Sequence, residues 1–447
     1  FGEQDMPNDM ANDNALLKAF NVAPVDGAPD WFGAATAAAA AKFETLGLPT
    51  NRTEAWKYTN LRELAGVAFV APSDEATAVD IPRDSVADIK GIEIVLVNGR
   101  LDEGRSTLDD LPVGLAITPL SKAIELGGGA VKHALEDESA IEGLPLAALS
   151  TAGITGGVLI EVAKNADIAK PIHIISIGTA GDEPVAFAPR NVVWVGPSAK
   201  ATLVESHVGV GQGSYFSNSV THVTVEDEAV FHHYKLQNEA RSAYHVAMTQ
   251  VTCGEKVIYD NFALSCGAKL ARNEIRGKLD GSEILYAVNG VYMAAANQHL
   301  DNTTFIEHAK PNSQSREIYK GVLDENGRGV FQGKILVQRP AQKTDGYQMN
   351  RALLLSRKAE IDSKPELEIY ADDVKCSHGA TVGELDDNQL FYLKARGIAE
   401  HDARNMLIEA YLRDALEEIR TDSVAQAFGA KITDWLAERA TREDAAR

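Results

Sequence analysis

The sequence predicts a mainly β protein with a helical region at each end, because the residue pattern changes twice along the 447-residue chain. Up to about Leu48 the chain is rich in Ala and Leu, with strong helix propensity from Ala34 to Lys42. From Ile92 onward, short apolar or β-branched runs alternate with Gly, Asn, Asp and Pro. After Leu385 apolar residues recur at helical spacing. We therefore expect a helical region at 1–85, a β core at 86–383 and a helical region at 384–447.

Two helices are expected to flank the first strands. The segment from Arg52 to Leu61 follows Pro49 and continues the N-terminal helical region. A further helix is expected between Leu120 and Glu136, inside the first part of the β region.

The β region contains a loosely repeated pattern of predicted strands. These are 92–97, 158–161, 172–177, 192–195, 202–204, 220–225, 230–234, 257–259, 284–286, 330–336 and 367–370. Turn-like sequences precede several of them at spacings near 13 or 28 residues, a pattern that suits a solenoid or a sandwich. Asn-Gly and Asp-Gly hairpin signals occur at only a few boundaries, so the sequence favours the solenoid slightly.

The C-terminal region is predicted to form helices throughout. Asp386 and Asp387 can cap a first helix, a second carries Leu407 to Ile419, and the last carries Val424 to Leu436. These helices can serve as a cap on the end of the β core or as a docking surface for another subunit. The sequence leaves both interpretations open.

Composition excludes several classes of partner. A formal net charge of −21 opposes sequence-independent binding to nucleic acid, which depends on Lys and Arg. No apolar run is long enough for a membrane span, and the amino terminus lacks the pattern of a secretory signal. Cys253, Cys266 and Cys376 are too few for a disulfide framework and suit free thiols in a reducing cytosol. We therefore expect a cytoplasmic protein.

Sequence motifs for common catalytic classes are missing. Gly333-Lys334 is followed by Ile335 where a phosphate-binding loop needs Ser or Thr, so we expect no nucleotide on this chain. Gly-x-Ser-x-Gly, His-Glu-x-x-His and Cys-x-x-Cys motifs do not occur. Adjacent residues on a strand face opposite sides, so His232 and His233 are not expected to chelate one ion together.

The most informative segment runs from Tyr370 to Gly383 and places Cys376 two residues before His378. On a strand these side chains share a face, and a thiolate with an imidazole can bind a thiophilic metal or an iron-sulfur fragment. A Cys in a strand can also be a core residue. Both roles remain open for Cys376.

This segment resembles the SufB/SufD family of the SUF iron-sulfur assembly system. The resemblance covers about Arg52 to Ile419 and rests on three blocks, of which the last is the most specific. They are Trp56-Lys-Tyr-Thr59; Lys343-Thr-Asp-Gly346 with Leu353 to Leu355; and Lys364-Pro-Glu-Leu-Glu-Ile-Tyr370, His378-Gly-Ala-Thr381, Gln389-Leu-Phe-Tyr-Leu393 and Arg396-Gly-Ile398.

The resemblance implies a right-handed parallel β-helix core with helical N- and C-terminal domains. At roughly 25 residues per turn, such a core would have about eight turns. It also implies a non-catalytic scaffold in a complex with a SufB-like paralogue and a SufC-like ABC ATPase that docks on the C-terminal helices. Pairing through the same strand edge can also support a homodimer when the paralogue is absent.

The resemblance further implies a role for the Cys376/His378 pair. SufB-like chains carry a sulfur-accepting cysteine near the position of Met349, and this chain has no cysteine between Gly267 and Lys375, which favours the SufD-like branch. His378 would then help hold a transient iron-sulfur cluster at the subunit interface, with Cys376 as a second ligand.

One alternative belongs to a different class. Asp372 and Asp373 near His378, on a possible β-helix, resemble the acid and base aspartates of polygalacturonases. The Asn-Thr-Asp and Arg-Ile-Lys elements of that class are missing. A carbohydrate-active enzyme is therefore the second hypothesis.

Overall fold

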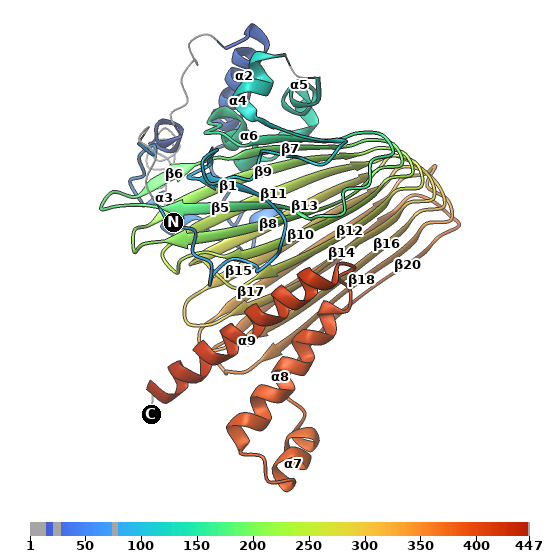
Figure 1. The fold of residues 1–447 in the computed structure, drawn as a ribbon. Coiled ribbons are helices and arrows are strands. Elements are labelled where there is room, and N and C mark those ends of the chain that lie inside the picture. The colour runs from blue at the N-terminus through green and yellow to red at the C-terminus, as the bar shows by residue number, and fades with distance from the viewer. Residues whose placement is uncertain (1–14, 21–27, 74–78, 128, 446–447) are drawn as a thin grey trace, which may run out of the picture.

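The computed structural model, which describes residues 15–20, 28–73, 79–127 and 129–445, is a β-solenoid of about eight turns with helices at both ends (Figure 1). Most turns contribute one strand to each of two facing sheets, and strands of neighbouring turns pair in parallel. Antiparallel pairing occurs where β1 meets β2 and where β3 meets β4. The expected mainly β architecture with helical ends is confirmed.

The two sheets are named A and B here. In spatial order sheet B contains β2 (Arg100–Leu101), β1 (Ile92–Val97), β5 (Ile172–Thr179), β8 (Lys200–Val210), β10 (Val230–Asn238), β12 (Ile258–Ser265), β14 (Leu285–Ala294), β16 (Gln314–Leu323), β18 (Asp345–Leu354) and β20 (Lys375–Gly383). Sheet A contains β3 (Leu115–Pro119), β4 (Val158–Val162), β7 (Arg190–Val195), β9 (Tyr215–Val225), β11 (Tyr244–Cys253), β13 (Leu270–Leu279), β15 (His299–His308), β17 (Arg328–Val337) and β19 (Glu360–Ile369), with β6 (Val185–Phe187) beside β9.

The named helices lie before, between and after the strands. Those in the first third of the chain are α2 (Asp30–Leu46), η1 (Glu54–Trp56), α3 (Arg62–Ala65), α4 (Leu120–Glu125), α5 (Gly129–Glu136), η2 (Glu138–Ala140) and α6 (Pro145–Ala152). The C-terminal helices are α7 (Asp387–Ala395), α8 (Glu400–Leu416) and α9 (Asp422–Ala445). The helix expected between Leu120 and Glu136 is thus two helices, and α6 was not predicted.

Successive turns are 28 to 31 residues long, as measured by hydrogen bonds between stacked residues of neighbouring turns. The 28-residue spacing of the sequence therefore corresponds to one turn, which is longer than the expected 25. Corner residues such as Ser198, Glu228 and Lys256 have positive φ. Each donates its backbone N–H to the corresponding corner of the next turn, which helps to offset the strain of a left-handed residue.

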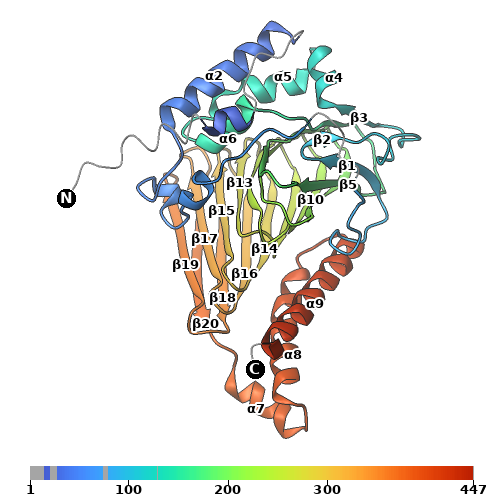
Figure 2. The same cartoon turned by 90° about the vertical axis from the view of Figure 1, so that its left-hand side faces the viewer.

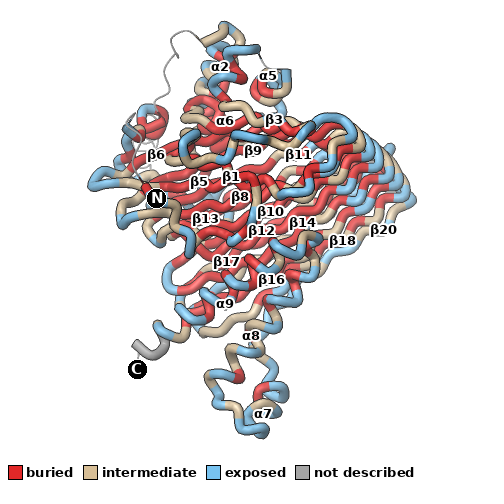
Figure 3. Tube along the Cα trace, viewed as in Figure 1, coloured by how far each residue is buried: buried red, intermediate tan, exposed pale blue. Residues whose placement is uncertain are grey.

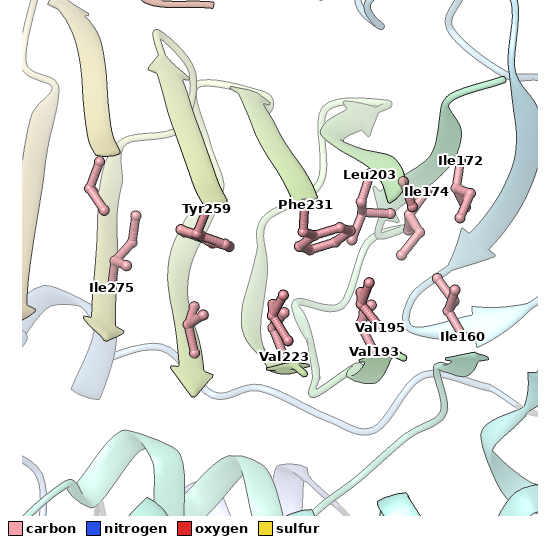
Figure 4. Packing of buried hydrophobic residues seen from close by; sticks show 14 of the residues in the cluster. Ile160, Ile172, Ile174, Val193, Val195, Leu203, Val223, Phe231, Tyr259 and Ile275 are labelled. Atoms are coloured by element: carbon pink, nitrogen blue, oxygen red, sulfur yellow. The ribbon is translucent and has the colours of Figure 1, made fainter. Parts of the chain in front are cut away.

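The solenoid interior is filled by facing rows of apolar side chains. Figure 4 shows Leu203, Phe231 and Tyr259 from sheet B opposite Val193 and Val223 from sheet A. These residues are almost fully buried, and burying side chains of this size stabilises the fold by about 1.5–3 kcal/mol each. The two-residue alternation along each strand places these side chains inside.

Polar groups interrupt this apolar interior in the middle turns. The Glu205 carboxylate lies 2.6 Å from His233 Nε2, and His233 Nδ1 lies 3.1 Å from the Tyr259 hydroxyl. Lys235 donates to Asn273 Oδ1 at 3.2 Å. Although burial alone would raise it, the pKa of Glu205 is well below its usual value because Lys235 and nearby histidines stabilise the carboxylate. The cluster is therefore an internally compensated set of charges.

The outer face of sheet A is covered by the N-terminal segment. The Arg272 guanidinium lies 4.1 Å from the centre of the Trp56 ring and donates to Asp301 Oδ2 at 2.6 Å. The Thr59 hydroxyl donates to the same carboxylate, and Gln332 Nε2 donates to a backbone carbonyl of this segment at 3.1 Å. The Trp56–Thr59 block thus has a structural role: it fixes the N-terminal segment to β13, β15 and β17.

The outer face of sheet B is covered by α8 and α9, which stand beside it in Figure 2. Phe428 and Ile432 belong to one apolar cluster with Phe262 and other sheet-B side chains. Arg439 donates to the Asp324 carboxylate at 2.6 Å, and both side chains are nearly buried. The C-terminal helices therefore cover the outer face of sheet B, whereas the cap interpretation placed them on the end of the β core.

Acid is expected to destabilise the fold because burial lowers the pKa of His173, His299 and His308 to about 4. The unfolded chain binds more protons between its histidine pKa near 6.5 and the folded value, so the free energy of unfolding falls as pH decreases through that window. Between pH 7.5 and 5 the free energy of unfolding should fall by about 2 kcal/mol less in His308→Asn than in the unmodified chain. Urea unfolding of the unmodified chain and of His308→Asn at the two pH values measures this difference. The same pH dependence of the unfolding free energy in both proteins would contradict it.

Candidate functional site

The solenoid ends at β19 and β20, which are the last strands of sheets A and B. Each pairs with the preceding turn on one side, β19 with β17 and β20 with β18, and has an open edge on the other. Exposure rises sharply there, as Figure 3 shows at β20. Side chains that would face the interior of a further turn are exposed at this end.

Cys376 and His378 lie on β20 and share the face that continues the solenoid interior. Cys376 packs against the cluster that contains Ile335 and Val337, and this contact shows that the thiol is on the interior face of β20. His378 pairs in register with the fully buried Gln348 and is itself exposed. The two positions are about 7 Å apart along the strand. The structure thus brings the predicted pair to one face at the open end.

The Cys376 thiol is half-buried, and its environment favours the neutral form. Burial raises its pKa, and the nearby Asp345 carboxylate acts in the same direction, while the backbone N–H of Gly346 opposes them. A metal ion that binds the sulfur would therefore have to displace a proton. Both interpretations of Cys376 retain a physical basis, since it packs against apolar residues and is accessible from the open end.

Met349 lies on the opposite face of the sheet. It pairs in register with Gly379, and a Cβ at Gly379 would lie 2.9 Å from the Met349 methyl carbon and 3.3 Å from its sulfur. The thioether therefore lies across Gly379, where a larger residue would crowd it. A side chain at position 349 points to the outer surface, whereas His378 points along the interior face.

The other polar pairs noted in the sequence do not form one site. His233 is inside the solenoid against Glu205, whereas His232 is outside, with Nδ1 3.4 Å from the Thr421 hydroxyl. The expectation that they face opposite sides is confirmed. Asp373 is exposed in the turn before β20 and forms an ion pair with Lys343. The second hypothesis, a carbohydrate-active enzyme, therefore gains no support from this turn.

Gly333 lies inside β17 rather than in a phosphate-binding loop. A Cβ there would lie 2.0 Å from Nε2 of Gln348, so this glycine makes room for a side chain from the facing sheet. Residues Glu317 and Gln348, on the interior face directly beneath His378, were missed by sequence analysis. Sequence analysis could have found them only as polar residues at inward-facing positions of successive turns. Those positions can be recognised only when the strand register is known.

The ligand set of this chain is small. Within the described ranges, no group of three or more His, Cys, Asp and Glu side chains is arranged to hold a metal ion. In the same ranges, no helix combines the length and apolar character that crossing a bilayer requires. The candidate ligands at the end of the solenoid are thus the half-buried Cys376 and the exposed His378.

Comparison with known proteins agrees with this architecture. The family model described as SUF system FeS cluster assembly, SufBD core domain, matches residues 177–411, and the SufBD protein N-terminal region matches residues 25–174. The chain is 33% identical to the iron-sulfur cluster assembly protein SufD of Escherichia coli, over 86% of this chain and 89% of the relative. It is 30% identical to the SufBD family protein slr0076 of Synechocystis, over 84% of each.

A chloroplast protein of Arabidopsis thaliana, ABCI7, is 34% identical over 58% of this chain and 56% of the relative. The fold and these matches together define a β-solenoid protein of an iron-sulfur assembly family. The chain belongs to the SufBD family of iron-sulfur cluster assembly proteins.

Native thiol labelling should modify Cys376 alone. Burial raises the pKa of Cys266 to about 12 and raises that of Cys253 further, and both side chains are buried. Iodoacetamide should alkylate one thiol in the folded chain, at a rate that still increases above pH 9, and three thiols in urea. Mass spectrometry measures the sites. Rapid labelling of the folded Cys376→Ser chain would contradict the expectation.

Proposed function

We propose that this chain is a non-catalytic scaffold subunit on which an iron-sulfur cluster is assembled as cargo. The observation that carries the proposal is the open edge of β20, where His378 is exposed and Cys376 is half-buried on the same face. Imidazole nitrogen and thiolate sulfur are both suitable ligands for the iron of a cluster. Family membership supports the assignment of the cargo.

The site is incomplete within one chain, so we infer that a second subunit provides the other ligands. The unpaired N–H and C=O groups of β19 and β20 can pair with the end strand of another solenoid. A SufB-like paralogue is the proposed partner, and a second copy of this chain can use the same edge when the paralogue is absent. We further infer a right-handed coil, the usual hand of parallel crossovers.

Each residue has a separate task in this arrangement. His378 binds iron through a ring nitrogen of its imidazole. Cys376 must lose its proton on binding. Because its pKa is raised, the thiol binds less readily than the imidazole until a nearby metal ion favours the thiolate. The free thiols suit a reducing compartment, and we place the protein in the cytoplasm.

The proposed ATPase contact is α7 with the start of α8. Phe391, Tyr392 and Met406 are large apolar side chains that are exposed there, and α7 extends away from the solenoid in Figure 2. Such a group of exposed apolar residues is typical of a protein contact. A SufC-like subunit would dock on this tip, while α8 and α9 cover sheet B. In this proposal, covering sheet B and docking the ATPase fall on different parts of the C-terminal region.

Phe391→Ala should reduce binding of the SufC-like ATPase by at least about tenfold, because a central aromatic anchor at an interface typically contributes 2 kcal/mol or more. Leu126→Ala is the matched control, since Leu126 and Phe391 are each 73% exposed, and α4, which Leu126 caps, and α7, which carries Phe391, lie at opposite ends of the molecule (Figure 1). Calorimetric titration of the ATPase subunit measures the affinity. Equal binding by the two variants would remove α7 from the interface.

His378→Ala should reduce the cluster yield of the reconstituted complex by at least about tenfold, a loss expected when a ligand or its support is removed. Subunit association should persist because the imidazole is exposed. Cys376→Ser should have a smaller effect, and Ser377→Ala, on the opposite face of β20, should have none. Cluster absorbance and gel filtration provide the two readouts. Full cluster assembly by the His378→Ala complex would refute the proposed site.

A further inference from the structure

Three polar residues stack in consecutive turns of sheet B and end at the proposed site. Glu317 on β16 pairs in register with Gln348 on β18, and Gln348 pairs in register with His378 on β20. All three are on the interior face, because alternate residues of these strands pack into the core. In-register neighbours in adjacent strands are about 4.8 Å apart, within reach of a side-chain hydrogen bond. The first two are fully buried, whereas His378 is at the open end.

The orientation of the Gln348 amide is fixed from below. Its Nε2 donates to Glu317 Oε1 at 3.3 Å, which leaves the carbonyl oxygen as the remaining hydrogen-bonding atom. This carbonyl oxygen, Oε1 of Gln348, is buried and accepts no hydrogen bond from the described residues. Gly333 on the facing sheet leaves the space that the amide occupies. A buried, unpartnered acceptor one turn below His378 is thus held in place by two separate features.

The Glu317 carboxyl keeps this orientation whether or not it carries a proton. The Thr304 hydroxyl is hydrogen-bonded to Oε2, whereas Gln348 binds Oε1. Burial raises the pKa of Glu317 to about 7, so both protonation states occur near neutral pH. A proton on Oε2 can be donated to Thr304 while Oε1 continues to accept from the amide. The acceptor directed at the next turn is therefore the same in both states.

We propose that Gln348 is a positioning residue for His378: its Oε1 atom accepts the N–H of the neutral imidazole and leaves the other ring nitrogen free to bind iron. An acceptor on one ring nitrogen fixes the tautomer and orientation of a metal-binding histidine. A buried carbonyl without a hydrogen bond is destabilising, and this hydrogen bond would satisfy it. The inference rests on the proposed function, because it assigns His378 as a ligand.

The test uses Gln348→Met, which keeps the length of the side chain and removes the acceptor. In the isolated full chain, ¹⁵N spectra of the imidazoles at pH 8.5 should show His378 as a single tautomer, identified by its loss in His378→Asn. Gln348→Met should convert it to a mixture of both tautomers. Gln332→Met is the matched control, because Gln332 is nearly buried on the outer face of β17 and bonds Ala55 instead.

A second variant reaches the same amide without changing it. Gly333→Ala places a methyl group against Gln348 Nε2 and should displace the amide, reproducing the tautomer mixture. In the reconstituted complex both variants should lower the cluster yield about tenfold, while Gln332→Met should not. An unchanged His378 spectrum in Gln348→Met would overturn the proposal. If His378→Ala itself leaves the yield intact, the proposed function fails, and the spectrum of the isolated chain still decides the Gln348 contact.

Discussion

The whole molecule depends on parallel, in-register backbone pairing between successive turns. Such pairing satisfies the N–H and C=O groups of every strand only where a turn lies on both sides. At the N-terminal end the antiparallel contacts of β1 with β2 and of β3 with β4 end the sheets. At the other end β19 and β20 remain open. The candidate site lies there because the repeat stops without a covering element.

The same repeat explains how much of the fold could be predicted. Apolar, β-branched runs such as those of β5 and β9 were identified because both faces of these strands are buried. Strands β11, β13, β15 and β16 were missed, because their interior positions include His245, Asn273, Thr304 and Glu317, which read as loop residues. A corner residue with positive φ such as Lys256 is neither Gly nor Asn and gave no turn signal.

The candidate site was predicted in part. Strand alternation alone placed Cys376 and His378 on one face, and the structure agrees because Cys376 packs against Ile335. Sequence could not indicate that this face belongs to the last turn, because exposure depends on the absence of a next strand. Nor could it place Gln348 below His378, since the 30 residues that separate them make a neighbour only once the turn length is fixed. The strand register therefore decides which residues neighbour His378.

The contact of the N-terminal segment with sheet A has a consequence for the order of events during synthesis. Thr59 bonds Asp301, 242 residues later, and Ala55 bonds Gln332, 277 residues later. At about 5–20 residues per second, the ribosome needs on the order of 15–55 s to make the chain between the latter two. For most of that interval, until Asp301 has been made, Trp56 has no Arg272–Asp301 surface to cover it. The aromatic ring is then an exposed apolar group on a nascent chain, which makes this segment a natural contact for a chaperone.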